Sequence, residues 1–148
     1  MSKPPLKGLA KAIRRARMHV HSYEVVTREA EEILFASAEV LSEGTLRETR
    51  GGRSYFGSTM ITLNLDAVSW REPLDEEARN RLLRAVQGSV RFRVRAMRLA
   101  YEEAARRVRE RPVGTALIDT KVRLSGRRLC LDVDLELPLR AAGCGARS

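Results

Sequence analysis

The segment ALIDTKVRLSGRRLCLDVDLEL, residues 116–137, constrains the fold of this chain more than any other stretch. Apolar and polar residues alternate on both sides of Gly126-Arg127, and a two-residue connection of this kind is typical of a tight β-hairpin. A turn at this position pairs Ile118 with Leu135 and makes one face of the hairpin apolar. The sequence therefore predicts two antiparallel strands at the C-terminal end of the fold.

The opposite face of this predicted hairpin is charged. Asp132, Asp134 and Glu136 share it with Asp119 and Lys121. Clustered carboxylates can hold Mg²⁺ or Ca²⁺, but basic side chains on the same face offset their charge. We therefore expect no metal there and an exposed hairpin face. The alternative for Asp132, Asp134 and Glu136 is an interface that docks the basic helix of another copy.

A third strand is predicted in residues 59–70, TMITLNLDAVSW. Ile61, Leu63 and Leu65 alternate there with polar residues, as in a half-buried strand. The preceding segment, residues 44–58, is rich in glycine and arginine, and we expect it to be a loop. The three strands together give a small, mainly antiparallel sheet.

The first of two long helices is predicted before this strand. From residue 9 to residue 43 there is no glycine or proline, and apolar residues recur with 4-3 spacing. Residues 6–43 are therefore expected to form one long helix, or two helices joined near Ser22, whose side chain can cap the second.

The second long helix is predicted between Asp75, which caps it, and Pro112, which ends it. Within it, residues 89–98, SVRFRVRAMR, alternate apolar and basic residues as a strand does. We favour a helix, with a strand as the alternative, because no turn residue follows before Pro112 and an apolar stripe runs through the stretch. This stripe leaves Phe92 and Leu99 on the far side, which predicts a second burial surface such as a protein interface.

These elements predict an α+β fold in which two long α-helices pack on the small sheet, in the order α-β-α-β-β. We expect one domain over residues 1–140 and a flexible tail at 141–148. Neither a transmembrane segment nor a secretory signal is expected. The two cysteines, Cys130 and Cys144, make no disulfide framework, so we expect a reducing, cytoplasmic location.

The net charge of +9 favours anionic partners, although 24 of the 28 basic residues are arginine, and a GC-rich genome is an alternative cause of that excess. On a helix, six arginines form a basic ribbon away from the apolar stripe, and guanidinium groups suit phosphate oxygens. These are Arg84, Arg91, Arg95, Arg98, Arg106 and Arg109. The alternative is a solvated helix face, since Glu102 can pair with Arg98 or Arg106.

Two smaller groups are further anion-binding candidates. Lys7, Lys11 and Arg14 lie at helical spacing near the N-terminus, where an ordinary solvated helix end is the alternative. In the expected loop, Arg50, Arg53 and Tyr55 combine basic and aromatic side chains, which suits stacking on single-stranded bases. A plain flexible loop with one aromatic side chain in the core is the alternative.

The chain offers no recognisable catalytic constellation. His19 and His21 are the only histidines and point to opposite sides of a helix, so a shared metal is not expected. The glycines match neither a P-loop nor a dinucleotide fingerprint, and nothing near Cys130 lowers its pKa. We therefore expect no cofactor and no metal, and we identify no small-molecule substrate.

Three function classes follow in order of preference. The first is a non-enzymatic, small basic subunit of a larger assembly, which associates with a protein partner or a second copy through its amphipathic helices. The second is a nucleic-acid-binding protein that uses the arginine ribbon and the basic N-terminus. The third is an enzyme of unknown class.

Overall fold

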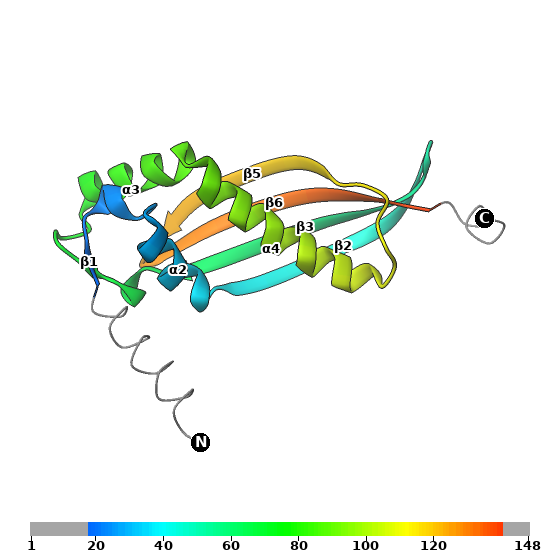
Figure 1. Ribbon diagram of the computed structural model, residues 1–148. Helices are drawn as coiled ribbons and strands as arrows, with labels where there is room; N and C mark the ends of the chain where they lie inside the picture. Colours follow the sequence, from blue (N-terminus) through cyan, green and yellow to red (C-terminus); the bar gives the residue numbers. More distant parts are fainter. Residues whose placement is uncertain (1–17, 141–148) are drawn as a thin grey trace, which may run out of the picture. The chain divides into compact units, whose positions relative to one another are not determined.

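The computed structural model describes residues 18–140, and the fold is α+β, as the sequence predicts (Figure 1). The tail at 141–148 and the candidates Lys7, Lys11 and Arg14 lie outside the described residues. None of the helices in residues 18–140 combines the length and apolar character needed to cross a membrane. The elements are β1 (His19–Val20), η1 (Ser22–Glu24), α2 (Arg28–Ala36), β2 (Glu39–Thr49), β3 (Gly52–Asn64), η2 (Leu65–Ala67), β4 (Ser69–Trp70), α3 (Glu76–Gly88), α4 (Val90–Val108), β5 (Ala116–Ser125) and β6 (Arg128–Leu139).

Contacts within the chain divide it into two compact units. In the described part, unit 1 holds residues 18–38, 63–93 and 123–129, and unit 2 holds residues 39–62, 94–122 and 130–140. Unit 1 is mainly helical. Unit 2 contains most of the four-stranded sheet and most of α4.

The sheet has the strand order β2-β3-β6-β5. β2 and β3 are antiparallel, with a register that runs from Glu39 opposite Thr62 to Thr49 opposite Gly52. The expectation of a loop over residues 44–58 is therefore wrong, since these residues form parts of both strands and the turn between them. Most side chains of β2 are exposed because it is an edge strand, so its sequence lacks the alternation that marks a half-buried strand.

A pair of glycines makes room for a tyrosine ring on this sheet. Gly44 lies opposite Gly57 in the β2–β3 register. A Cβ atom added to Gly44 would lie 2.6 Å from Tyr55 Cζ, and one added to Gly57 would lie 2.8 Å from Tyr55 Cε2. The ring therefore lies over both glycines, where it packs in a core cluster with Ala104 and Leu137.

β5 and β6 form the predicted hairpin, and its turn is at Gly126-Arg127. Gly126 has φ of 60°, a conformation that glycine adopts at little cost. Every second residue of β6 from Leu131 to Leu139 is buried. In unit 2, α4 covers this side of the sheet, where Ala104 packs with Leu137 (Figure 1).

Residues 89–98 are helical from Val90 onward, as favoured, but the second long helix predicted from the sequence is interrupted. α3 ends at Gly88, and Ser89 Oγ accepts a hydrogen bond from the Phe92 N–H at 3.2 Å, which starts α4 as a new helix. The predicted order α-β-α-β-β therefore misses this division of the helix as well as strand β2.

The interruption also changes which face of α4 is buried. Ala96, Ala100 and Ala104 are fully buried at four-residue spacing. Val90 and Val94, which belong to the apolar stripe read from the sequence, are 65% and 38% exposed. The predicted stripe is wrong in α4 because it assumed one uninterrupted helix, whereas the chain restarts its helix after Gly88.

The long helix predicted over residues 6–43 is wrong in its described part, where only α2 is a regular α-helix. Thr27 Oγ1 accepts the Ala30 N–H at 3.4 Å and caps α2, while Glu24 Oε1 accepts the His21 N–H at 2.7 Å within a separate short turn. Polar side chains that bond to nearby backbone groups offer the chain an alternative to a continuous helix. Beyond α2 the chain enters β2.

The core of unit 1 contains a small apolar cluster between short elements. β1 and β4 pair in parallel, with Val20 opposite Trp70. Val20 packs with Ala30, Ile33 and Val68, and Trp70 is packed against this cluster. The Trp70 Nε1–H donates to the Leu65 carbonyl at 2.8 Å, so the polar end of the indole is satisfied.

Candidate functional site

One face of the sheet in unit 2 lies away from α4. On β6, Leu135 and Leu137 are buried on the α4 side, and the residues between them alternate to the other side. We call that other side the open face. Its side chains are Leu41, Glu43, Thr45, Arg47, Ser54, Phe56, Ser58, Met60, Asp132, Asp134 and Glu136.

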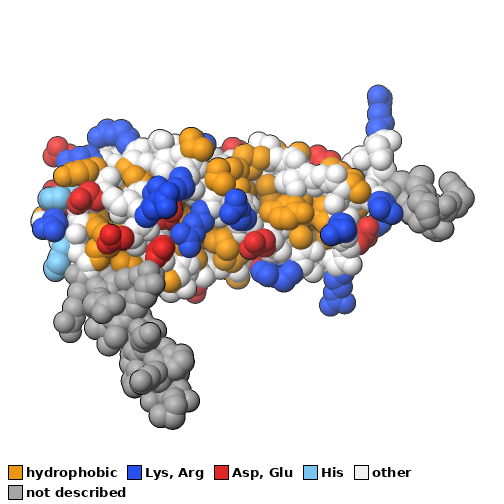
Figure 2. Space-filling view, in the orientation of Figure 1, with side chains coloured by type: hydrophobic (Ala, Val, Ile, Leu, Met, Phe, Trp, Pro, Cys, Tyr) orange, Lys and Arg blue, Asp and Glu red, His pale blue; other side chains and the backbone are white. Residues whose placement is uncertain are grey.

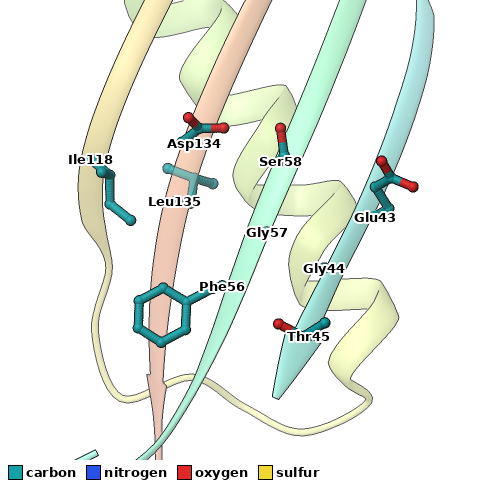
Figure 3. Close-up of a pocket in the computed structure, with 9 residues that line it drawn as sticks. All are labelled: Glu43, Gly44, Thr45, Phe56, Gly57, Ser58, Ile118, Asp134 and Leu135. Atoms are coloured by element: carbon teal, nitrogen blue, oxygen red, sulfur yellow. The ribbon is translucent and has the colours of Figure 1, made fainter. Parts of the chain in front are cut away.

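A groove of about 460 Å³ crosses the open face (Figure 3). Glu43, Ser58 and Asp134 form one wall, and Thr45 and Phe56 form the other. The positions between the walls, which include Gly44, Gly57 and Leu135, alternate toward α4, so strand backbone forms the floor. A second depression of about 620 Å³ adjoins it along Leu41, Met60 and Asp132.

The charge of the groove is negative on a chain whose net charge is positive. Within residues 18–140, no cation is in salt-bridge contact with Glu43 or Asp134. Nearby, Glu136 Oε2 accepts a hydrogen bond from Ser54 Oγ at 2.7 Å. The groove therefore presents two carboxylates that can accept hydrogen bonds from a cationic group.

The aromatic wall already holds one guanidinium group. Arg47 Cζ lies 4.9 Å from the centre of the Phe56 ring, which is a cation–π arrangement. Glu43, Thr45 and Phe56 were not among the candidates from the sequence because residues 44–58 were read as a loop. The regular alternation of buried and exposed residues after Gly52 is the sequence signal that could have found them.

The arginines of the predicted ribbon differ in their surroundings. In unit 1, Arg84 is exposed, while Arg91 lies 3.3 Å from Glu31 Oε2 through Nε and donates to the Val26 carbonyl at 2.5 Å. In unit 2, Arg95 is half-buried, Arg98 and Arg109 are exposed, and Arg106 forms an ion pair with Glu103. The hydrogen bond from Glu103 also raises the pKa of Arg106.

The space-filling view agrees with this division. Figure 2 shows Lys and Arg side chains interleaved with acidic and apolar ones on the face it displays, instead of one continuous basic patch. Ion pairs within the chain therefore occupy part of the ribbon that the sequence assigned to anion binding.

The candidates near the β2–β3 turn are only partly available. Arg50 is exposed in the turn, but Arg53 Nη2 donates to both carboxylate oxygens of Glu110 at 3.0 and 3.1 Å and to the Arg140 carbonyl. Tyr55 is only 6% exposed, so the proposed stacking of its ring on nucleic-acid bases is wrong.

The candidates for a protein interface separate in the same way. Phe92 is fully buried, and its ring centre is 5.1 Å from that of Phe35, so its assignment to an interface is wrong and it belongs to the core. Leu99 is half-buried. Asp132 and Asp134 are half-buried on the open face, as is Glu136, and the structure thus brings these three together with the groove residues.

Comparisons with known proteins leave the function to the geometry. A scan against protein-family models, a search of curated proteins and a search of solved structures each found no match to this chain. In the part of the chain that the structure describes, no group of three or more His, Cys, Asp or Glu side chains could hold a metal ion. The open face is therefore the candidate functional site.

Proposed function

We propose that this chain is a non-enzymatic assembly component whose open face docks a basic segment of a protein partner. The observation that carries the proposal is charge separation. In a chain of net charge +9, the open face gathers the carboxylates of Glu43, Asp132, Asp134 and Glu136 beside apolar side chains. Leu41 at the margin of this face is 67% exposed. Apolar area with charged groups around it is typical of a protein-binding surface.

The groove suits a lysine or arginine side chain. A cation lying between its walls would meet the carboxylates of Glu43 and Asp134 and the face of the Phe56 ring. Exposed salt bridges and exposed cation–π contacts each contribute about 0.5–1 kcal/mol. Burial of Leu41 and Met60 at about 25 cal/mol per Å² would add an apolar contribution of similar size.

Nucleic acid is the second candidate, and exposed Arg98 and Arg109 on α4 favour it. Its support is weaker for two reasons. Arg91 and Arg106 are paired with carboxylates, and Tyr55 is buried. The open face would in addition repel phosphate groups.

A peptide-binding experiment tests the proposal on the full-length chain. The probe is a fluorescent peptide in which arginine and leucine alternate, and its match carries glutamate in place of arginine. We expect the basic peptide to bind and the double variant Glu43→Gln/Asp134→Asn to weaken binding about tenfold, which corresponds to about 1.4 kcal/mol.

The control variant is Glu48→Gln/Glu102→Gln, which removes the same charge from exposed positions outside the open face. It should change the affinity less than twofold, and circular dichroism should show that both variants are folded. Equal binding of the acidic peptide, or an equal loss in the control variant, would refute docking at the groove.

A further inference from the structure

β5 ends the sheet on the side opposite β2, and its outer edge carries exposed apolar residues. Leu117 and Ile118 on β5 are 48% and 57% exposed, and Val113 just before the strand is 60% exposed. Large apolar side chains on an edge strand mark a surface that can pair with another strand.

The backbone at the middle of β5 also faces outward. The Thr120 N–H donates to Asp119 Oδ1 at 2.9 Å, so a side chain of its own strand satisfies it in place of a carbonyl on β6. Asp119 Oδ2 lies 3.8 Å from Lys121 Nζ, an exposed and long ion pair. Thr120 Oγ1 is buried and has no hydrogen-bond partner among the described residues. The edge is therefore covered by exchangeable side-chain contacts.

We propose that two copies of this chain pair through β5, antiparallel, about a two-fold axis at Thr120. In this register, Asp119 of each copy faces Lys121 of the other, and Ile118 of each faces Val122 of the other. The two Thr120 residues face each other, which supplies a partner for their hydroxyl groups. Every pair is repeated by the symmetry, as an isologous interface requires.

The charges of the two edges favour β5 over β2 as the paired strand. β2 carries three glutamates and one arginine, and that arginine, Arg47, lies over Phe56. β5 carries one aspartate, one lysine and one arginine. Pairing β2 with itself would bring six carboxylates to one seam, and like charges on adjacent strands are destabilising.

This inference rests on the proposed function in one respect. A two-fold axis that joins edge strands leaves both open faces on the same side of a continuous sheet, four strands coming from each copy. Two docking faces presented together would raise the avidity for a partner with repeated basic segments.

Cysteine cross-linking tests the register. In a chain with Cys130→Ala and Cys144→Ser, we expect Thr120→Cys to form a disulfide-linked dimer under mild oxidation, because the two cysteines would meet at the axis. Leu124→Cys lies on the same strand away from the axis and Thr45→Cys lies on the other edge, and neither should cross-link.

Light scattering on chains with native cysteines tests the charge pairs, with circular dichroism as the check on folding. Wild type should have twice the monomer mass, and Lys121→Asp should raise the dissociation constant about tenfold. The exchange Asp119→Lys/Lys121→Asp should restore dimers to near the wild-type affinity.

The outcomes separate this inference from the proposed function. A monomeric wild type, or a dimer that cross-links at Thr45 or Leu124 in place of Thr120, would overturn β5 pairing even if the basic peptide binds the groove. A dimer linked through Thr120 that does not bind the peptide would support β5 pairing and refute docking.

Discussion

At the scale of single residues, the paired glycines under Tyr55 set a steric requirement on the sheet. A Cβ atom on Gly44 would lie 2.4 Å from the Phe56 carbonyl oxygen as well as against Tyr55, whereas on Gly57 the contacts are with the Tyr55 ring alone. We expect Gly44→Ala to destabilise the fold by roughly 2–3 kcal/mol and Gly57→Ala by roughly 1 kcal/mol, because backbone yields less than a side chain. Urea unfolding measures both. Gly88→Ala, with no atom within 4 Å of its Cβ position, should be neutral or stabilising by up to about 1 kcal/mol.

Another residue-scale requirement is the ionised carboxylate of Glu72 in unit 1. The Ser22 N–H donates to Glu72 Oε1 at 2.7 Å and Arg81 Nη2 donates to Oε2 at 2.5 Å. The Ser22 backbone, then its side chain and Arg81, lower the pKa of Glu72 from 4.5 to about 2. Protons therefore bind more tightly to the unfolded chain, and the stabilisation is present above pH 4.5 and is lost as the pH falls toward about 2.

Glu72→Gln tests this pH dependence. The variant should be less stable than wild type at neutral pH, and the difference should shrink between about pH 4.5 and about pH 2, measured as the shift of the urea midpoint. Glu76→Gln, an exposed carboxylate at the start of α3, serves as the control. A difference between wild type and Glu72→Gln that stays constant over this pH range would refute the role of the charge.

At the scale of elements, Ser89 decides that α3 and α4 are separate helices. Its Oγ accepts the Phe92 N–H, and its carbonyl accepts the Arg93 N–H at 3.1 Å, so it caps α4. Ser89→Ala should destabilise the fold by about 1 kcal/mol, and Ser89→Asp should retain the stability because aspartate also caps helices and suits the helix dipole. Thermal unfolding of the two variants checks this. Equal losses in both would mean that the hydroxyl bond contributes nothing.

Elements with one buried and one polar face could be read from the sequence, and the others could not. The hairpin at Gly126-Arg127 and the alternation at Ile61 and Leu63 are confirmed because their inward side chains are buried by α4 or by unit 1. β2 is exposed on both faces, so it has no hydrophobic period to read. The groove lies between β2 and β6, and its carboxylates at Asp132 and Asp134 could be predicted while its other wall could not.

At the scale of the whole molecule, net charge opposes the pairing of two copies and favours contact with polyanions. Each copy carries +9, so two copies repel each other, and salt screens that repulsion over a Debye length of about 10 Å at 0.1 M. Nucleic-acid binding has the opposite dependence, because each phosphate contact releases counterions and salt reverses that gain. The sign of the salt effect therefore separates the two modes of association.

We expect the dimer to become tighter, by roughly twofold, when sodium chloride is raised from about 50 mM to about 300 mM, because the apolar pairs of Ile118 with Val122 remain while the repulsion is screened. Binding of the basic peptide to the groove, measured by fluorescence anisotropy, should weaken over the same range, since its charges are opposite to those of Glu43 and Asp134. Light scattering after nuclease treatment measures the dimer at each salt concentration. A mass that falls to that of the monomer after nuclease treatment, or with rising salt, would mean that a polyanion bridges the copies, and it would favour the nucleic-acid function over assembly through β5.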